Sequence, residues 1–160
     1  RDLKQPYTMI TLTRTNSENE DFLSLVKHLD KELAIRDGSD HAFYSQFNKV
    51  DHIKYVVIAY ENNQAIGCGA IKAYDEKTME VKRMYVLESF RGLGVASQIL
   101  SDLETWSAWL GMEYCVLETG LQQPEAIQLY NKNDYKIIPN YGQYQGVSNS
   151  VCFQKSLLKL

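Results

Sequence analysis

Hydrophobic and polar positions change period several times along the chain, and each change marks an expected element. Residues 7–14 alternate polar and apolar side chains, which predicts a half-buried strand. Apolar residues then recur at helical spacing and predict a helix over residues 19–36, with Asn16 or Ser17 as its N-cap and Asp37-Gly38 at its end. These apolar positions are Phe22, Leu25, Val26, Leu29 and Leu33.

The next stretch predicts a short helix over residues 41–47 and then three strands. Strands over residues 54–61 and 65–74 flank Asn62-Asn63-Gln64, which is typical of a hairpin. Another turn follows and leads into a strand over residues 79–87. The short turns predict that the three strands are antiparallel neighbours.

The second half of the chain predicts a long helix from about Gly94 to Gly111 and then β and α elements in alternation. One face of this helix carries Val95, Ile99, Leu100, Leu103, Trp106, Trp109 and Leu110, so both tryptophans are expected in the core. A strand over residues 114–119 should run parallel to residues 79–87 through a right-handed crossover. A helix over 124–132 and strands over 135–138 and 150–156 complete the chain. The predicted fold class is α/β: one domain over residues 1–160, with a mixed, mostly antiparallel sheet of six to seven strands flanked by helices.

Composition narrows the class of protein. The 160 residues are 44% hydrophobic and 23% charged, with a net charge of −3, and no basic stripe is present, so neither nucleic acid nor a membrane is an expected partner. No apolar run approaches the roughly 18 residues of a membrane span, and the first residues lack a signal-peptide core, which predicts a cytoplasmic protein.

Cysteine and histidine positions give no metal signature. Cys68, Cys115 and Cys152 lie in apolar strand-like runs and form no Cys-x-x-Cys pair, so buried reduced thiols are expected, with a zinc site or a nucleophile as the alternative. The three histidines are scattered without the spacing of metal ligands. No metal is predicted.

A glycine-rich segment, residues 91–96, lies between a predicted strand and a predicted helix. Such a turn lets backbone N–H groups approach an anion, to which the helix N-terminus adds about half a positive charge. A P-loop is excluded, because no lysine follows Gly94 until Lys132. A dinucleotide fingerprint is only partly matched: Gly92, Gly94 and Ser97 fill its glycine positions, so the third glycine is missing.

A third pattern fits better. Arg91, Gly94 and Ala96 match Arg/Gln-x-x-Gly-x-Gly/Ala, which resembles the acyl-CoA signature of the GNAT superfamily of N-acetyltransferases. Residues 126–135 also resemble the second signature of that family, Ala-x-x-Leu-Tyr-x-x-x-Gly-Phe/Tyr. Two positions depart from the family pattern: Asp134 replaces glycine, and Gln123 stands where asparagine is frequent. Aspartate tolerates the left-handed conformation better than most residues, so a helix C-terminus remains feasible there.

The resemblance implies the acyl-CoA N-acyltransferase fold and acetyl-CoA as cosubstrate, without a metal. It implies a cofactor site of backbone and side-chain groups from the strand, the glycine-rich turn and the following helices. These residues are Met84, Tyr85, Val86, Arg91, Gly92, Leu93, Gly94, Val95, Ala96, Ser97, Gln123 and Tyr130.

The transfer chemistry needs a base for the amine and an acid for the thiolate. An amine of pKa near 10 is only about one part in a thousand neutral at pH 7. Glu80 is the first candidate base, because its spacing from Val86 and Arg91 resembles that of the basic glutamate in some family members. It could instead pair with Lys82 or Arg83. Glu118 is the rival carboxylate. Tyr130 occupies the position from which family members protonate sulfur, and its alternative role is packing.

The acceptor is expected between two loops. Arg36 and His41 lie in the first, where Arg36 could bind a substrate carboxylate or pair with a neighbouring aspartate. Tyr141 and Tyr144 lie in the second, where tyrosine rings could face an ammonium group. Both loops could also be solvated connections.

These observations predict an enzyme that moves an acetyl group from acetyl-CoA to a primary amine of a small molecule by direct attack. Two alternatives stay open: acetylation of a protein lysine or N-terminus, and a module that binds acyl-CoA without turnover. A homodimer is also left open.

Overall fold

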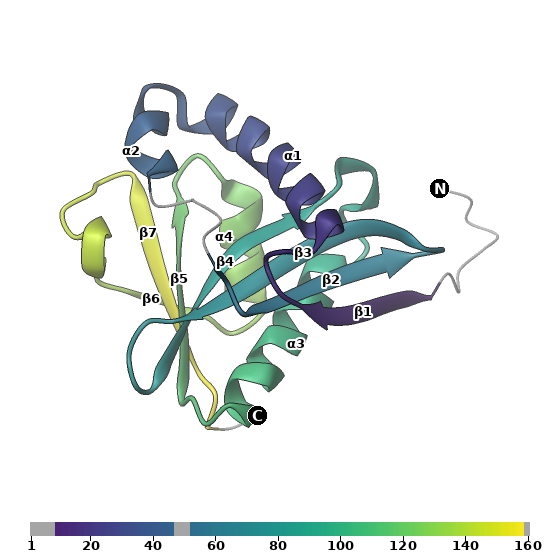
Figure 1. Cartoon of the computed structure of the whole chain (residues 1–160). Coiled ribbons are helices and arrows are strands. Elements are labelled where there is room, and N and C mark those ends of the chain that lie inside the picture. The colour runs from purple at the N-terminus through teal and green to yellow at the C-terminus, as the bar shows by residue number, and fades with distance from the viewer. Residues whose placement is uncertain (1–8, 47–51, 159–160) are drawn as a thin grey trace.

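In the computed structural model, which describes residues 9–46 and 52–158, helices cover both faces of one seven-stranded sheet (Figure 1). The strands are β1 (Ile10–Thr15), β2 (Tyr55–Glu61), β3 (Gln64–Ala73), β4 (Thr78–Val86), β5 (Tyr114–Gly120), β6 (Lys136–Ile138) and β7 (Ser150–Ser156). The α-helices are α1 (Glu20–Asp37), α2 (His41–Ser45), α3 (Val95–Trp109) and α4 (Pro124–Lys132). Residues 7–8 of the first predicted strand and residue 47 of the predicted short helix lie outside the described residues.

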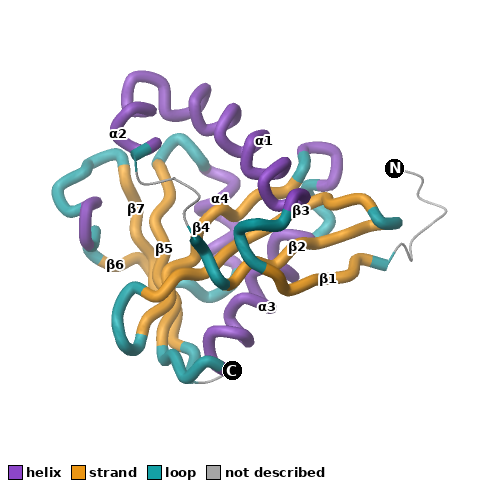
Figure 2. The backbone as a smooth tube through the Cα atoms, in the orientation of Figure 1, coloured by secondary structure: helices purple, strands orange, loops and turns teal. Residues whose placement is uncertain are grey.

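The strand order is β1-β2-β3-β4-β5-β7-β6, and β4–β5 is the parallel pair among antiparallel neighbours. The predicted mixed, mostly antiparallel sheet and the parallel crossover are therefore confirmed. The parallel ladder is short, since it pairs only Thr78–Glu80 with Tyr114–Val116. Beyond it, β4 stays with β3 and β5 stays with β7, so the sheet opens between β4 and β5 (Figure 2).

The continuous apolar run in β2 reflects burial on both faces of the sheet. Val56 and Ile58 pack in the cluster that contains Phe22 of α1, whereas Val57 and Ala59 pack in the cluster that contains Leu103 of α3. Successive side chains of a strand point to opposite faces, so a strand covered on both sides needs apolar residues at every position.

A β-bulge marks the middle of β4. The β3–β4 register shifts between Cys68 and Ala70, and Arg83 on the facing strand has a φ of 59°, in the left-handed region. Gly69 lies opposite the bulge, where an added Cβ would come within 2.5 Å of the Met84 sulfur. Only glycine allows this close approach of β3 to the bulged strand.

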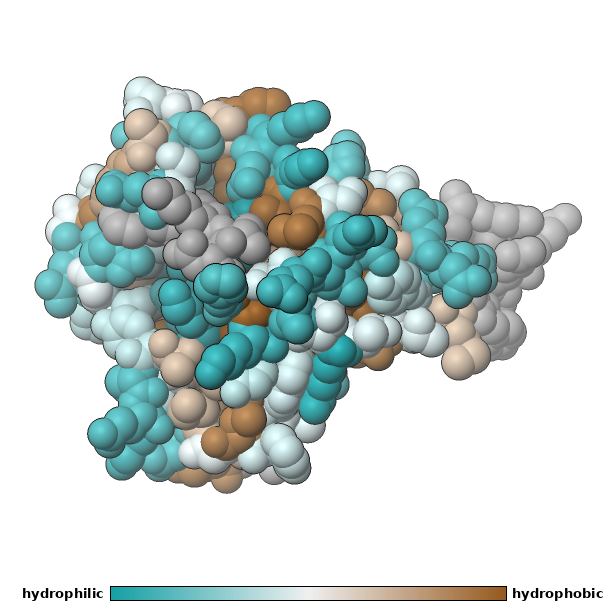
Figure 3. All heavy atoms as spheres, viewed as in Figure 1, coloured by the Kyte–Doolittle hydropathy of each residue, from teal (hydrophilic) through white to brown (hydrophobic). Residues whose placement is uncertain are grey.

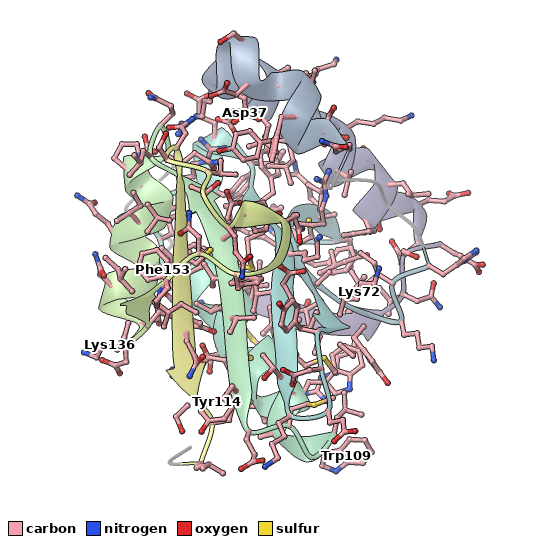
Figure 4. All side chains as sticks on the ribbon, turned by 90° about the vertical axis from the view of Figure 1, so that its left-hand side faces the viewer. Asp37, Lys72, Trp109, Tyr114, Lys136 and Phe153 are labelled. Atoms are coloured by element: carbon pink, nitrogen blue, oxygen red, sulfur yellow. The ribbon has the colours of Figure 1, made fainter. Side chains whose placement is uncertain are left out.

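Two details differ from the sequence predictions. Asn19 caps α1, because its Oδ1 accepts hydrogen bonds from the backbone N–H groups of Asp21 and Phe22, while the Ser17 hydroxyl accepts one from the Ile53 N–H. Trp109 is 80% exposed and lies at the end of α3 far from Asp37 (Figure 4). The prediction that both tryptophans are core residues is therefore wrong for Trp109.

The surface shown in Figure 3 is mainly hydrophilic, with scattered apolar residues. The three cysteines are buried and free, as predicted. Within the described ranges, no helix is both long and apolar enough to cross a membrane.

Candidate active site

A cleft of about 550 Å³ lies where β4 and β5 part, and α1, α2, α3 and α4 contribute to its walls. This volume suits a small-molecule ligand. Most of the residues predicted for the site line it: Arg36, Glu80, Met84, Tyr85, Val86, Arg91, Gly92, Gly94, Val95, Ala96, Ser97, Glu118, Gln123, Tyr130 and Tyr144. Leu93, His41 and Tyr141 are not among the lining residues.

The glycine-rich turn forms one end of the cleft. Gly92 and Gly94 have φ values of 78° and 82°, and an added Cβ at either position would meet no atom within 4 Å. Gly94 ends the turn as the N-cap of α3, whose first N–H groups have no partner within the helix. Open space, N–H groups without a partner in the helix and a helix N-terminus together suit a pyrophosphate, so these residues fit coenzyme A. Leu93 is instead 47% exposed to solvent.

The Arg91 side chain is already engaged by protein groups. Its Nε donates to the Val86 carbonyl at 2.8 Å, and its two terminal nitrogens donate to the Glu32 carboxylate of α1 at 3.0 and 2.9 Å. The hydrogen bonds to Glu32 raise the pKa of Arg91. Arg91 thus ties the turn to β4 and α1, a contact that the sequence did not predict.

Glu118 lies on β5 just beyond the last pair of the parallel ladder. Its Oε2 accepts a hydrogen bond from the Ser150 hydroxyl of β7 at 2.6 Å. Burial raises its pKa to about 7; the Ser150 hydrogen bond opposes this rise, while nearby Asp37 and Glu80 add to it. A carboxyl group that titrates near neutral pH in a cleft is suited to general acid–base chemistry.

Glu80 lies on the opposite strand but in a different environment. It accepts a hydrogen bond from the Tyr141 hydroxyl at 2.5 Å, and Lys82 Nζ lies 3.6 Å from its other oxygen. The pairing with Lys82 that the sequence left open is therefore present. Tyr141 contacts Glu80 rather than the cleft, and its ring packs edge-on against Tyr74 and Tyr144.

Tyr130 of α4 lines the cleft and is buried against the rings of Tyr135 and Phe153. Burial, followed by the nearby charge of Glu118, raises its pKa, so the hydroxyl stays protonated and can donate a hydrogen bond. Asp134 has a φ of 69°, so the helix does end at a left-handed aspartate in place of glycine.

Of the four residues predicted to bind the acceptor, Arg36 and Tyr144 line the cleft, whereas His41 and Tyr141 do not. Arg36 lines the cleft, but its guanidinium donates to Glu125 of α4 at 2.8 Å and lies 3.8 Å from Glu32. His41 is not among the lining residues, and its Nδ1 lies 3.8 Å from an Asp37 carboxylate oxygen. Asp37 lines the cleft in its place, and burial raises its pKa.

Besides Asp37, three contributors were not predicted from the sequence: Glu32, Tyr44 and Ser150. Tyr44 lines the cleft and lies within hydrogen-bond distance of Ser150, which in turn holds Glu118. None of the three belongs to a motif. The strand register between β5 and β7 would have revealed Ser150, because Ser150 lies two residues from the partner of Glu118 on the same face.

No group of three or more histidine, cysteine, aspartate or glutamate side chains in residues 9–46 and 52–158 could hold a metal ion.

Comparisons with known proteins agree on one protein family. The family model described as the acetyltransferase (GNAT) family matches residues 17–135. The chain is 28% identical over 151 residues to a protein named IAA acetyltransferase from Azospirillum brasilense, which covers 92% of this chain and 98% of that protein.

Solved structures extend the match to nearly the whole fold. A crystal structure from Klebsiella pneumoniae, provisionally named an acyl-CoA N-acyltransferase, has a TM-score of 0.78 at 26% identity and covers 94% of this chain and 99% of that one. A GNAT family acetyltransferase from Elizabethkingia anophelis with acetyl-CoA bound has a TM-score of 0.64 at 19% identity and covers 92% of this chain and 97% of that one.

Proposed function

Because the chain belongs to the GNAT acetyltransferase family and is an acetyl-CoA-dependent acyltransferase, we propose that it acetylates the primary amine of a small molecule by direct attack. The observation that carries this proposal is the position of Glu118. It lies where β4 and β5 part, in a cleft whose other end is the glycine-rich turn.

Acetyl-CoA, when bound, supplies the acetyl group as a thioester. The turn at Gly92–Gly94 and the N-terminus of α3 would hold its pyrophosphate. One edge of β4 beyond Glu80 faces the cleft instead of β5, so backbone N–H groups among residues 84–86 would be available to a thioester oxygen.

Glu118 would remove the proton from the acceptor ammonium. With a pKa of about 7, it is largely ionised at slightly alkaline pH and is basic enough to take that proton. Glu80 is less suited to this role, because the Tyr141 hydroxyl and Lys82 already occupy its oxygens. Tyr130, which stays protonated, would donate to the departing sulfur.

The walls of the cleft favour a small amine. Each arginine that lines the cleft has a carboxylate partner: Arg36 binds Glu125, Arg83 binds Asp30 and Arg91 binds Glu32. A substrate carboxylate would have to displace one of these partners, whereas an ammonium group would meet Glu118 and the rings of Tyr44 and Tyr144. The Arg36–Glu125 pair also links α1 to α4 beside the cleft, which leaves less room for a protein chain.

A thiol-release assay with a panel of acceptors tests the proposal. We expect acetyl-CoA turnover with small primary amines and weaker turnover with amino acids and lysine peptides. Preferential turnover with lysine peptides would instead indicate a protein acceptor. Thermal stabilisation by coenzyme A without turnover on any amine would indicate a binding module.

A further inference from the structure

A chain of hydrogen bonds leads from Glu118 through Ser150 to Tyr44. Ser150 Oγ donates to Glu118 Oε2 at 2.6 Å and lies 2.9 Å from the Tyr44 hydroxyl oxygen. Ser150 and Tyr44 are both only 6% exposed. The three side chains come from β5, β7 and α2, so tertiary structure alone brings them together.

The fold holds Ser150 in place from two sides. In the β5–β7 ladder, Glu118 pairs with Cys152 and Gly120 with Ser150, so Ser150 lies diagonally across from Glu118 on the same face. The Asn140 side chain donates to the carbonyls of Val147 and Ser150 and fixes the start of β7. The strand pairing and the Asn140 hydrogen bond therefore fix the backbone of Ser150, which limits where its hydroxyl can lie.

This geometry meets a need of the proposed reaction. Each transfer leaves one proton on Glu118, which must be lost before the next turnover. Bound substrates would occupy the cleft side of Glu118, so this proton needs a route through the protein. The hydrogen bond to Ser150 lies behind the lining, because Glu118 and Tyr44 line the cleft and Ser150 does not.

We propose that Ser150 and Tyr44 form a proton relay that carries the amine proton from Glu118 to the turn between α1 and α2. This inference rests on the proposed function and on Glu118 as its base. The Glu118 carboxyl gives its proton to Ser150 Oγ, the Ser150 hydroxyl proton passes to the Tyr44 oxygen, and the Tyr44 proton leaves to water or a carboxylate at the turn. Because Ser150 donates to Glu118 in the resting state, the two hydroxyls must first rotate so that Ser150 donates to Tyr44. Each oxygen then gains one proton and loses one, and the transfer restores the resting arrangement.

Two carboxylates near Tyr44 are the candidate acceptors of its proton. Burial raises the pKa of Tyr44, and the charges of Glu118, Asp40 and Asp37 add to the rise. Asp37 ends α1, and Asp40 lies in the turn that follows. Asp40 is exposed and so reaches bulk water. On the cleft side, Glu118 also faces the titratable groups Glu80, Lys82, Tyr130 and Tyr144.

Replacing Tyr44 by phenylalanine is the decisive test, because it removes the last hydroxyl while the Glu118–Ser150 hydrogen bond stays intact. We expect kcat for the best amine to fall about tenfold, with the acceptor KM unchanged and a larger solvent isotope effect on kcat. Tyr55→Phe is the matched control, since Tyr55 packs on Trp106 outside the cleft lining. A kcat of Tyr44→Phe equal to that of the control would overturn the relay. A rise in KM without loss of kcat would do the same and make Tyr44 an acceptor contact.

Ser150 variants separate relay from mere positioning. Ser150→Ala should lower kcat at least as much as Tyr44→Phe, and Ser150→Thr, which keeps a hydroxyl, should restore most of it. If Ser150→Ala lowers kcat while Tyr44→Phe does not, Ser150 only positions Glu118 and the relay is refuted. Turnover by the wild-type protein comes first, because its absence on every amine would refute the proposed function instead.

Discussion

At the α3 end of the cleft the groups offered to a ligand are main-chain atoms, whereas at the β5 end they are side chains. The α3 end is one contiguous segment, in which the left-handed glycines Gly92 and Gly94 lead into a helix N-terminus. The β5 end combines Glu118, Tyr44 and Tyr144 from three separate elements.

Because one end of the cleft offers main-chain atoms and the other offers side chains, we expect the two ends to respond differently to pH. Backbone N–H groups do not titrate in the physiological range, so binding at the α3 end should depend little on pH. The β5 end holds carboxylates in a desolvated setting, where burial moves the pKa of Glu118 to about 7. Catalysis, and not binding at the turn, should therefore carry the pH dependence near neutrality.

The largest effect is expected for Glu118→Gln, which removes the proposed base but keeps its shape. We expect kcat to fall by about 10²–10⁴ and the rise of rate with pH near 7 to disappear. Glu80→Gln is the matched change on the facing strand and should keep that rise, with a smaller loss. Measured pH–rate profiles that show the reverse assignment would make Glu80 the base.

Glu118→Gln should also stabilise the protein at alkaline pH. The pKa of Glu118 is raised from 4.5 to about 7, so the folded state holds the proton more tightly and stability from this group declines as pH rises through that window. Above pH 7 the penalty corresponds to about 3 kcal/mol. Urea melts should show Glu118→Gln more stable than wild type at pH 8 and similar at pH 5.

Glu76→Gln serves as the control for this stability prediction, because it makes the same chemical change at an exposed position in the β3–β4 turn. Its free energy of unfolding should track that of wild type at both pH values. Equal stability of Glu118→Gln and wild type at pH 8 would mean that burial does not destabilise the charged form of Glu118.

The sequence predicted the α3 end well because its information is local. The glycines, the preceding strand and the following helix are adjacent in the chain, and left-handed φ values follow from residue type. The same holds for Asp134, whose residue type made a left-handed helix end feasible and which has a left-handed φ in the structure. The strand and helix periods likewise placed all seven strands.

The β5 end could not be predicted fully, because its contacts depend on tertiary register. Ser150 is 32 residues from Glu118 and 106 from Tyr44, and no local pattern links them. The Arg91–Glu32 pair spans 59 residues for the same reason. Trp109 was misplaced because the last turn of α3 extends past the apolar core, so helical spacing alone did not determine its burial.

Tyr130→Phe tests the proposed acid of the reaction, which lines the cleft. Only the hydroxyl is lost, so we expect kcat to fall about tenfold while the affinity for acetyl-CoA stays near that of wild type. Tyr135→Phe is the control: its ring packs against Tyr130 but is not among the cleft lining. Wild-type kcat in Tyr130→Phe would assign Tyr130 to packing.

Gly94→Ala tests the main-chain end. A left-handed alanine costs about 1 kcal/mol, and relief of that strain would shift the turn and weaken coenzyme A binding. Gly111→Ala is a close match, because Gly111 also has a left-handed φ, 89°, with open space around it, but lies at the other end of α3. Both variants should lose similar stability, and only Gly94→Ala should lose affinity in coenzyme A titrations.

The smallest effect is expected for Arg36→Ala, at the edge of the side-chain end. Arg36 was a candidate ligand for a substrate carboxylate, but its guanidinium binds Glu125 at 2.8 Å and lies near Glu32. Partly exposed ion pairs contribute about 0–1 kcal/mol, so neither stability nor the KM for simple amines should change much.

The KM of amino acids gives the sharper measurement. If Arg36 recognises a carboxylate, Arg36→Ala should raise that KM about tenfold or more and leave the KM of the matching decarboxylated amines unchanged. If Arg36 only links α1 to α4, the two acceptor classes should respond alike, and Glu125→Ala should reproduce the effect. We expect the second outcome, because binding a carboxylate would require Arg36 to give up a partner it already holds, and the amine would still find Glu118 within the cleft.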